Sequence, residues 1–230
     1  MSNKEKEYAT ETGMENVEQA LSKSEQFIED NQKVLTIIMF AVIIVIGGYW
    51  GAKKLYFAPQ EQQAQIEIFA AQNYFERDSF KLALNGDGMN LGFLAISEDY
   101  GMTKPGKLAK YYAGVSYLHL GQFDDAIDFL GGFSSGDELL NATAKGALGD
   151  AYLEKGDVNA AISNYKSAGD VDNMVIAPTY LLKLGLVYEE QKQYTDAVEA
   201  YETIKNDFKT SIEARSIDKY ITRAQILASK

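Results

Sequence analysis

The sequence predicts an all-α protein, in which a single N-terminal transmembrane helix is followed by a solenoid of helix-turn-helix repeats. Residues 34–50 form a run of 17 residues without a charge, and three later stretches share one spacing of Gly, Tyr and Ala. From about residue 58 onward, no clear strand-like alternation of apolar and polar residues occurs. A long apolar run favours a membrane span, and a repeat of about 35 residues favours stacked helical pairs.

The composition excludes several classes of function. The 230 residues carry 22 basic and 33 acidic side chains, for a net charge of −11, with one His and no Cys. This acidic excess argues against nucleic-acid binding, which needs cations to neutralise phosphates. The absence of Cys excludes disulfides and thiolate zinc sites, and a single His excludes multi-histidine metal sites. We expect no metal and no cofactor.

The uncharged run extends from Val34 to Ala52, which is 19 residues. As a helix it spans about 28 Å, close to the hydrocarbon thickness of a bilayer. Lysines flank it on both sides, and Tyr49 and Trp50 lie at its end, where amphipathic rings favour the headgroup layer. We therefore assign residues 34–54 to a transmembrane helix.

Two other interpretations of this run compete. A cleaved signal peptide has a short basic leader, but here 33 residues with four Lys and eight acids come first. A buried core helix seldom lacks a polar face. The lysines near the two ends balance, so charge bias alone does not set the orientation.

The first 33 residues, with a net charge of −4, form a polar acidic tail. A thin apolar stripe follows Val17, Leu21 and Ile28. It favours a disordered tail that is helical only near the membrane, with a short surface helix as the alternative.

Gly47 and Gly51 have the G-x-x-x-G spacing within the apolar run. Such small residues let two transmembrane helices approach closely, so this pair is a candidate helix contact. The alternative is that glycines are simply frequent in membrane helices.

Three stretches between residues 106 and 208 share a Gly, a Tyr three residues later, an Ala nine residues after that, and a bulky residue four further on. The Gly lets the two helices of a pair approach, and the small Ala sits where they cross. This spacing resembles the tetratricopeptide repeat, a helix-turn-helix unit of about 34 residues. We predict three such repeats, carried by Gly114, Tyr117, Ala126 and Leu130; Gly149, Tyr152, Ala161 and Tyr165; and Gly185, Tyr188, Ala197 and Tyr201.

The repeats depart from the consensus in two places. The turn glycine of the first two repeats, Gly121 and Gly156, is replaced by Lys192 in the third. The early aromatic residue is replaced by Lys110, Lys145 and Leu181.

Both flanks of the repeats are expected to be helical. Residues 55–105 hold a linker helix, a degenerate repeat in which Tyr74 and Ala83 keep the nine-residue spacing, and an insertion. Residues 209–230 form a capping helix, which we expect to begin at a capping box, Thr210-x-x-Glu213. Its apolar face, which covers the last repeat as a solenoid cap must, consists of Ile217, Ile221 and Ala224.

No catalytic motif stands out. The Asn-Gly-Asp-Gly stretch at 85–88 is a turn rather than a calcium loop, because Met89 occupies a ligand position. His119 stands alone, and the P-loop, G-x-S-x-G and dinucleotide fingerprints are absent. The protein is not expected to be an enzyme.

Helical repeats bind partners on the inner face of their first helices, so this face is the candidate site. It is predicted to be an apolar groove with acidic spots, without the Lys/Arg clamp that captures a peptide carboxylate. The alternative is that a neighbouring helix of the same chain fills it. The residues predicted to line the groove are Leu108, Tyr111, Val115, Leu118, His119, Asp150, Leu182, Leu186 and Glu189.

The domain order, the stretches KLAKYYAGVSYLHLGQFDDAIDFL and YLLKLGLVYEEQKQYTDAVEAYETI, and the terminal helix at 217–224 resemble the YfgM-like family of bacterial inner-membrane proteins associated with the Sec translocon. The resemblance implies a cytoplasmic N-terminus and periplasmic repeats. It also implies partners: translocon channel subunits, a membrane-anchored periplasmic prolyl isomerase chaperone and emerging polypeptides. It brings no catalytic residue. Two functions stay open: a translocon-associated scaffold, or a generic membrane-tethered adaptor in another envelope or cytoplasmic-face assembly.

Overall fold

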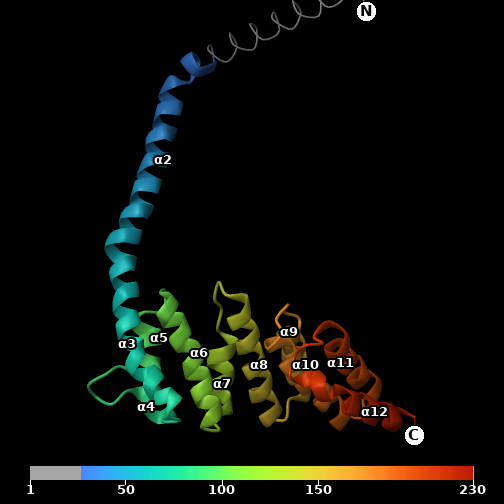
Figure 1. The fold of residues 1–230 in the computed structure, drawn as a ribbon. Coiled ribbons are helices and arrows are strands. Elements are labelled where there is room, and N and C mark those ends of the chain that lie inside the picture. Colours follow the sequence, from blue (N-terminus) through green and yellow to red (C-terminus); the bar gives the residue numbers. More distant parts are fainter. Residues whose placement is uncertain (1–26, 230) are drawn as a thin grey trace, which may run out of the picture. The chain divides into compact units, whose positions relative to one another are not determined.

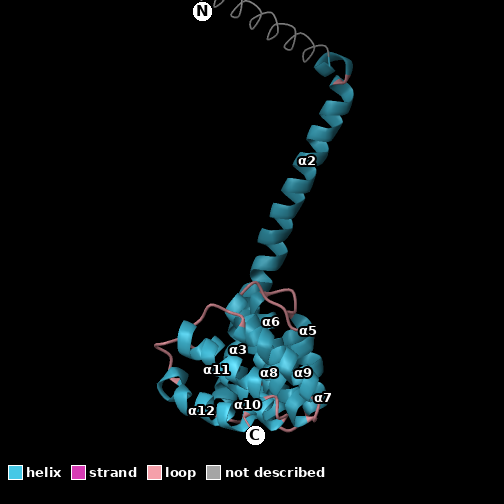
Figure 2. Cartoon of the chain, turned by 90° about the vertical axis from the view of Figure 1, so that its right-hand side faces the viewer, coloured by secondary structure: helices cyan, strands magenta, loops and turns pink. Residues whose placement is uncertain are grey.

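The computed structural model describes residues 27–229, and the chain divides into two compact units, 1–58 and 59–230. Every regular element within the described range is a helix (Figure 2), which confirms the all-α prediction. Most of the predicted acidic tail, including Val17 and Leu21, lies outside the described residues.

The first unit contains helix α2 (Gln32–Ala52) and a short π-helical turn (Lys53–Phe57). No residue of α2 is buried by another described part of the chain, although the helix is apolar all round. Such a helix is stable in water only if its surface is covered, and lipid is the solvent that suits it. Among the described residues, one helix is long and apolar enough to cross a membrane, as the sequence predicts.

The second unit is a row of helices that follow one another in space in the order of the sequence (Figure 1). From α4 onward each helix packs on its neighbours along the chain, and α3 shares a core cluster with α4, which is the organisation of a solenoid. A short 3₁₀ helix (Glu213–Ser216) precedes the last of them. The helices are α3 (Ala58–Glu76), α4 (Phe80–Asn85), α5 (Phe93–Asp99), α6 (Lys104–His119), α7 (Phe123–Gly131), α8 (Glu138–Glu154), α9 (Val158–Gly169), α10 (Ile176–Glu190), α11 (Tyr194–Asp207) and α12 (Ile217–Ala228).

Within each repeat, the glycine of the first helix allows close contact with the bulky residue of the second. A Cβ atom placed on Gly114 would lie 2.6 Å from Cγ of Leu130, and one on Gly149 would lie 2.8 Å from the Tyr165 ring. One on Gly185 would collide with the Tyr201 ring. Because these side chains fill the space that a larger residue would need, the glycines set the distance between paired helices.

Four turns between paired helices share one geometry. In each, the carbonyl of the repeat tyrosine accepts a hydrogen bond from the N–H five residues later, and the residue before that donor has a positive φ. The degenerate repeat, formed by α3 and α4, makes the same turn as the three predicted repeats. The residues with positive φ are Asp78 (56°), Gly121 (72°), Gly156 (82°) and Lys192 (61°).

Lys192→Gly is expected to stabilise the protein. A residue with a Cβ atom at positive φ has a backbone strain of roughly 1 kcal/mol, which is absent in glycine. The gain is partly offset by the freedom that glycine adds to the unfolded chain. Gln191→Gly is the matched control, because Gln191 has a φ of −81° and only the offsetting loss applies there. Thermal unfolding followed by circular dichroism should give a higher midpoint for Lys192→Gly than for Gln191→Gly. The reverse order would contradict this account.

The C-terminal helix α12 buries Ile217, Ile221 and Ala224. The predicted capping box is wrong in detail. Neither the 3₁₀ helix nor α12 has a side-chain hydrogen bond at its N-cap, and Oγ of Ser211, rather than that of Thr210, accepts from the N–H of Ala214 at 3.1 Å. Glu213 is instead used in a long-range contact, in which Oε1 accepts from the hydroxyl of Thr179 at 3.0 Å.

Candidate functional site

The first-helix face is defined here as the surface formed by α6, α8 and α10. On α6 the predicted groove residues Leu108, Tyr111, Val115 and Leu118 are half-buried, because they pack against the core. His119 is directed elsewhere, because its ring stacks on the ring of Phe80 on α4, with the centroids 4.4 Å apart. His119 therefore takes part in packing against the preceding pair of helices.

Tyr180 of α10 lies across α8, because Gly146 has no side chain there. A Cβ atom on Gly146 would collide with the Tyr180 ring. The Tyr180 hydroxyl donates to the carbonyl of Thr143 at 3.3 Å, and its ring stacks 6.3 Å from that of Tyr165. Sequence reasoning missed Tyr180, since nothing local to residues 176–190 indicates that a glycine 34 positions earlier makes room for it.

Asp150 of α8 is the centre of a hydrogen-bonded cluster. Its Oδ1 accepts from the Tyr165 hydroxyl at 2.6 Å, and Nζ of Lys183 donates to its two oxygens at 2.7 and 2.8 Å. Nζ of Lys183 also lies 5.5 Å from the centroid of the Tyr180 ring. Burial raises the pKa of the Tyr165 hydroxyl, and the hydrogen bond to Asp150 raises it further. The acid predicted as a free acidic spot is thus engaged by a cation from the next repeat.

Glu189 of α10 shows the same arrangement one repeat further on. Its side chain is only 12% exposed, and it accepts from the Tyr201 hydroxyl at 2.9 Å. Arg223 of α12 donates to both carboxylate oxygens, from Nε at 2.8 Å and from a terminal nitrogen at 3.0 Å. This two-point pairing is the strongest geometry for an arginine and a carboxylate. The capping helix therefore neutralises the second predicted acidic spot.

The apolar residues of α10 differ in their access to solvent. Leu182 is half-buried against the core, whereas Leu186 is 37% exposed. With Asp150 and Glu189 both paired, the two acids predicted for the groove are neutralised, and apolar and aromatic side chains lie beside them. Recognition there would depend on burial of apolar groups.

Comparison with known families agrees with this geometry. A family model described as Tetratricopeptide repeat matches residues 146–208, and a second model of the same description matches residues 108–134. The chain contains tetratricopeptide repeats. No curated protein matches the chain.

The matched segments of the tetratricopeptide repeats fall on helices α6 to α11. Their turns and their glycine contacts are those described above. Tetratricopeptide repeats imply protein partners, because the stacked helices present extended surfaces rather than catalytic clefts.

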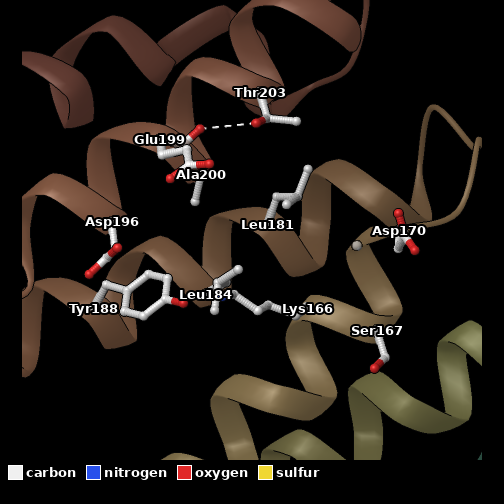
Figure 3. Close-up of a pocket in the computed structure, with 11 residues that line it drawn as sticks. Lys166, Ser167, Asp170, Leu181, Leu184, Tyr188, Asp196, Glu199, Ala200 and Thr203 are labelled. Carbon is white, nitrogen blue, oxygen red and sulfur yellow. Dashed lines mark hydrogen bonds between the residues drawn. The ribbon is translucent and has the colours of Figure 1, made fainter.

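A cleft of about 440 Å³ lies between α9 and α11, the second helices of two tetratricopeptide repeats (Figure 3). Leu181 and Leu184 of α10 line it between the two second helices. Sequence reasoning missed this cleft, because its walls come from three helices whose distances depend on the stacking of the repeats.

The turn at 85–88 is closed by Asp87. Its carboxylate accepts from the N–H groups of Met89 and Asn90 at 2.9 and 2.7 Å, and from the Tyr74 hydroxyl at 2.7 Å. These hydrogen bonds, led by that from Asn90, lower the pKa of Asp87 below its ordinary value. The part of the chain that the structure describes holds no group of three acidic or histidine side chains that could bind a metal.

Proposed function

We propose that this protein is a non-enzymatic, membrane-anchored scaffold that binds partner proteins on the first-helix face of its tetratricopeptide repeats. The observation that carries the proposal is the presence of partly exposed apolar side chains on that face, among them Tyr111 on α6 and Leu186 on α10, together with carboxylates that are already paired. Such a surface suits an apolar partner segment. Helix α2 supplies the anchor.

For the partner, we infer an accessory role at the Sec translocon, with the repeats linking its channel subunits to a membrane-anchored periplasmic prolyl isomerase chaperone. The N-terminus would lie in the cytoplasm and the repeats in the periplasm, with a single span in the inner membrane. The resemblance of the domain order and repeat stretches to the YfgM-like family supports this inference.

The orientation can be tested by labelling, because the chain has no Cys and a single introduced one is unique. Ser134→Cys, in the exposed loop after α7, should react with a membrane-impermeant maleimide on cells whose outer membrane is opened. Ser2→Cys should react only after the inner membrane is opened as well. The opposite pattern would place the repeats in the cytoplasm and favour a cytoplasmic-face adaptor.

The partners can be tested by placing a photo-crosslinking residue at position 186 in the full chain and purifying the protein in mild detergent. Translocon subunits and a periplasmic chaperone, identified by mass spectrometry, are the expected products. If the only crosslinks were to another membrane assembly, the proposed scaffold function would still hold, but the assignment to the translocon would be wrong.

Leu186→Glu should reduce these crosslinked partners severalfold, while the thermal midpoint stays nearly unchanged, because a side chain that is 37% exposed loses little packing. A carboxylate would have to be desolvated when the partner binds. Ile212→Glu is the matched control, since Ile212 is 76% exposed and lies outside this face. Equal loss of partners in both variants would contradict a site on the first-helix face.

A further inference from the structure

The cleft between α9 and α11 has an apolar floor and charged walls. Leu181 and Leu184 of α10 and Ala200 of α11 form the floor, and α9 supplies Lys166 to one wall. Asp196 and Glu199 of α11 stand on the opposite wall (Figure 3). The walls belong to the second helices α9 and α11, and the floor residues of α10, Leu181 and Leu184, are not among the residues assigned to the first-helix face.

The residue at one floor position of the cleft differs from its counterparts in the first two repeats. Position 181 corresponds to Lys110 in the first repeat and Lys145 in the second. The Lys110 side chain reaches the carbonyl of Gly132, at the C-terminal end of the second helix of its own repeat, at 2.8 Å. Leu181 has no donor group and cannot make this hydrogen bond. Gly169 lies beside Leu181 and has no side chain; a Cβ atom placed on it would lie 3.0 Å from the Leu181 side chain.

The acidic wall is absent from the second repeat, whereas the first repeat carries Asp125 and Asp128 at the corresponding positions. Asp196 and Glu199 correspond to Ala160 and Ser163 in the second repeat. Because the second repeat folds with these small residues, the carboxylates are not needed for the framework. Neither carboxylate, nor that of Asp170 on the rim, forms an ion pair with any described residue.

One cation of the chain already rests in the cleft. Nζ of Lys166 lies 5.8 Å from the centroid of the Tyr188 ring, within the range of a cation–π contact. With three acids and one lysine lining the cleft, its charge is negative overall. The site therefore attracts cations, and Lys166 competes with any that come from outside.

We propose that this cleft docks a segment of a partner protein that places an apolar side chain on the leucine floor and flanking Lys or Arg side chains on the acidic walls. A volume of about 440 Å³ is of the size that takes bulky side chains. Charge complementarity selects a basic segment over an acidic one. This second docking surface lets the scaffold hold two partners at once.

The test measures binding of a fluorescein-labelled synthetic peptide, Gly-Lys-Arg-Leu-Phe-Lys-Arg-Gly, to the full chain in a non-ionic detergent by fluorescence anisotropy. The double variant Asp196→Ala, Glu199→Ser carries the residues of the second repeat and is expected to bind at least fivefold more weakly, since it loses two charge contacts. Glu202→Ser, at an exposed position on the same helix outside the cleft, is the matched control and should bind as the parent does. Lys166→Ala should bind about twofold more tightly, because the competing cation is gone.

Three results would overturn the proposal. The first is equal weakening by Glu202→Ser, which would show that only the general acidity of the helix matters. The second is equal binding of a peptide with Ser in place of Leu and Phe, which would exclude the apolar floor. The third is no saturable binding below about 1 mM, a concentration at which even a weak specific site is filled. Circular dichroism of each variant confirms that it is folded.

Discussion

Gly149→Leu is expected to lower the free energy of unfolding by about 3 kcal/mol, as overpacking of a tight contact does. The reason is the Tyr165 ring, whose atoms lie 2.8 Å from the place where the new Cβ would be. Tyr165 cannot move aside, because it is 1% exposed and its hydroxyl is held by Asp150. The paired helices α8 and α9 must therefore separate.

The control is Gly131→Leu, at the end of α7, where a Cβ would meet nothing within 4 Å. There the substitution should be neutral or slightly stabilising, because leucine favours a helix by up to about 1 kcal/mol over glycine. Chemical denaturation of both variants, followed by circular dichroism, gives the comparison. Retained stability in Gly149→Leu would show that the assigned repeat register is wrong.

Asp150→Ala is expected to lower the free energy of unfolding by about 2 kcal/mol, because it leaves a buried hydroxyl without an acceptor. Tyr165 loses the 2.6 Å hydrogen bond to Asp150, and its side chain is only 1% exposed. Lys183 loses less, since its side chain is 40% exposed and can be hydrated again.

Asp150→Asn separates the two contributions. Its amide oxygen can still accept from Tyr165, while the ion pair with Lys183 is lost, so the loss should stay below about 1 kcal/mol. In a Tyr165→Phe background, Asp150→Ala should cost much less than in the parent protein, which a double-mutant cycle measures. If Asp150→Ala were equally costly with and without the tyrosine hydroxyl, the assigned hydrogen bond would not matter for stability.

The spacing of a few residues predicted much of the fold. The Gly, Tyr and Ala positions indicated which residues meet inside each helical pair, because those contacts are made between residues close in sequence. The same spacing at Tyr74 and Ala83 indicated the degenerate pair, and the structure shows its turn to match the others, with Asp78 at positive φ. The substitution of Lys192 for a turn glycine was visible in the sequence, but its strained backbone was not.

The first-helix face was only partly predictable. Periodicity placed Leu186 and Glu189 on this face. It did not predict which side chains of other helices contact them. Glu189 meets Arg223, 34 residues later, and His119 stacks on Phe80, 39 residues earlier. The sequence therefore predicted acidic spots where the structure has ion pairs.

The helical class, the membrane-length apolar run and the contacts inside each repeat could be predicted from the residues alone, because they depend on local periodicity and on the size of a few side chains. Three features depend on the tertiary structure: the position of the Tyr180 ring against Gly146, the ion pair between Asp150 and Lys183, and the cleft lined by Leu181. The physical reason is that local pattern sets which side of a helix is buried. The distance and rotation between stacked repeats decide which long side chains meet and where a space is left.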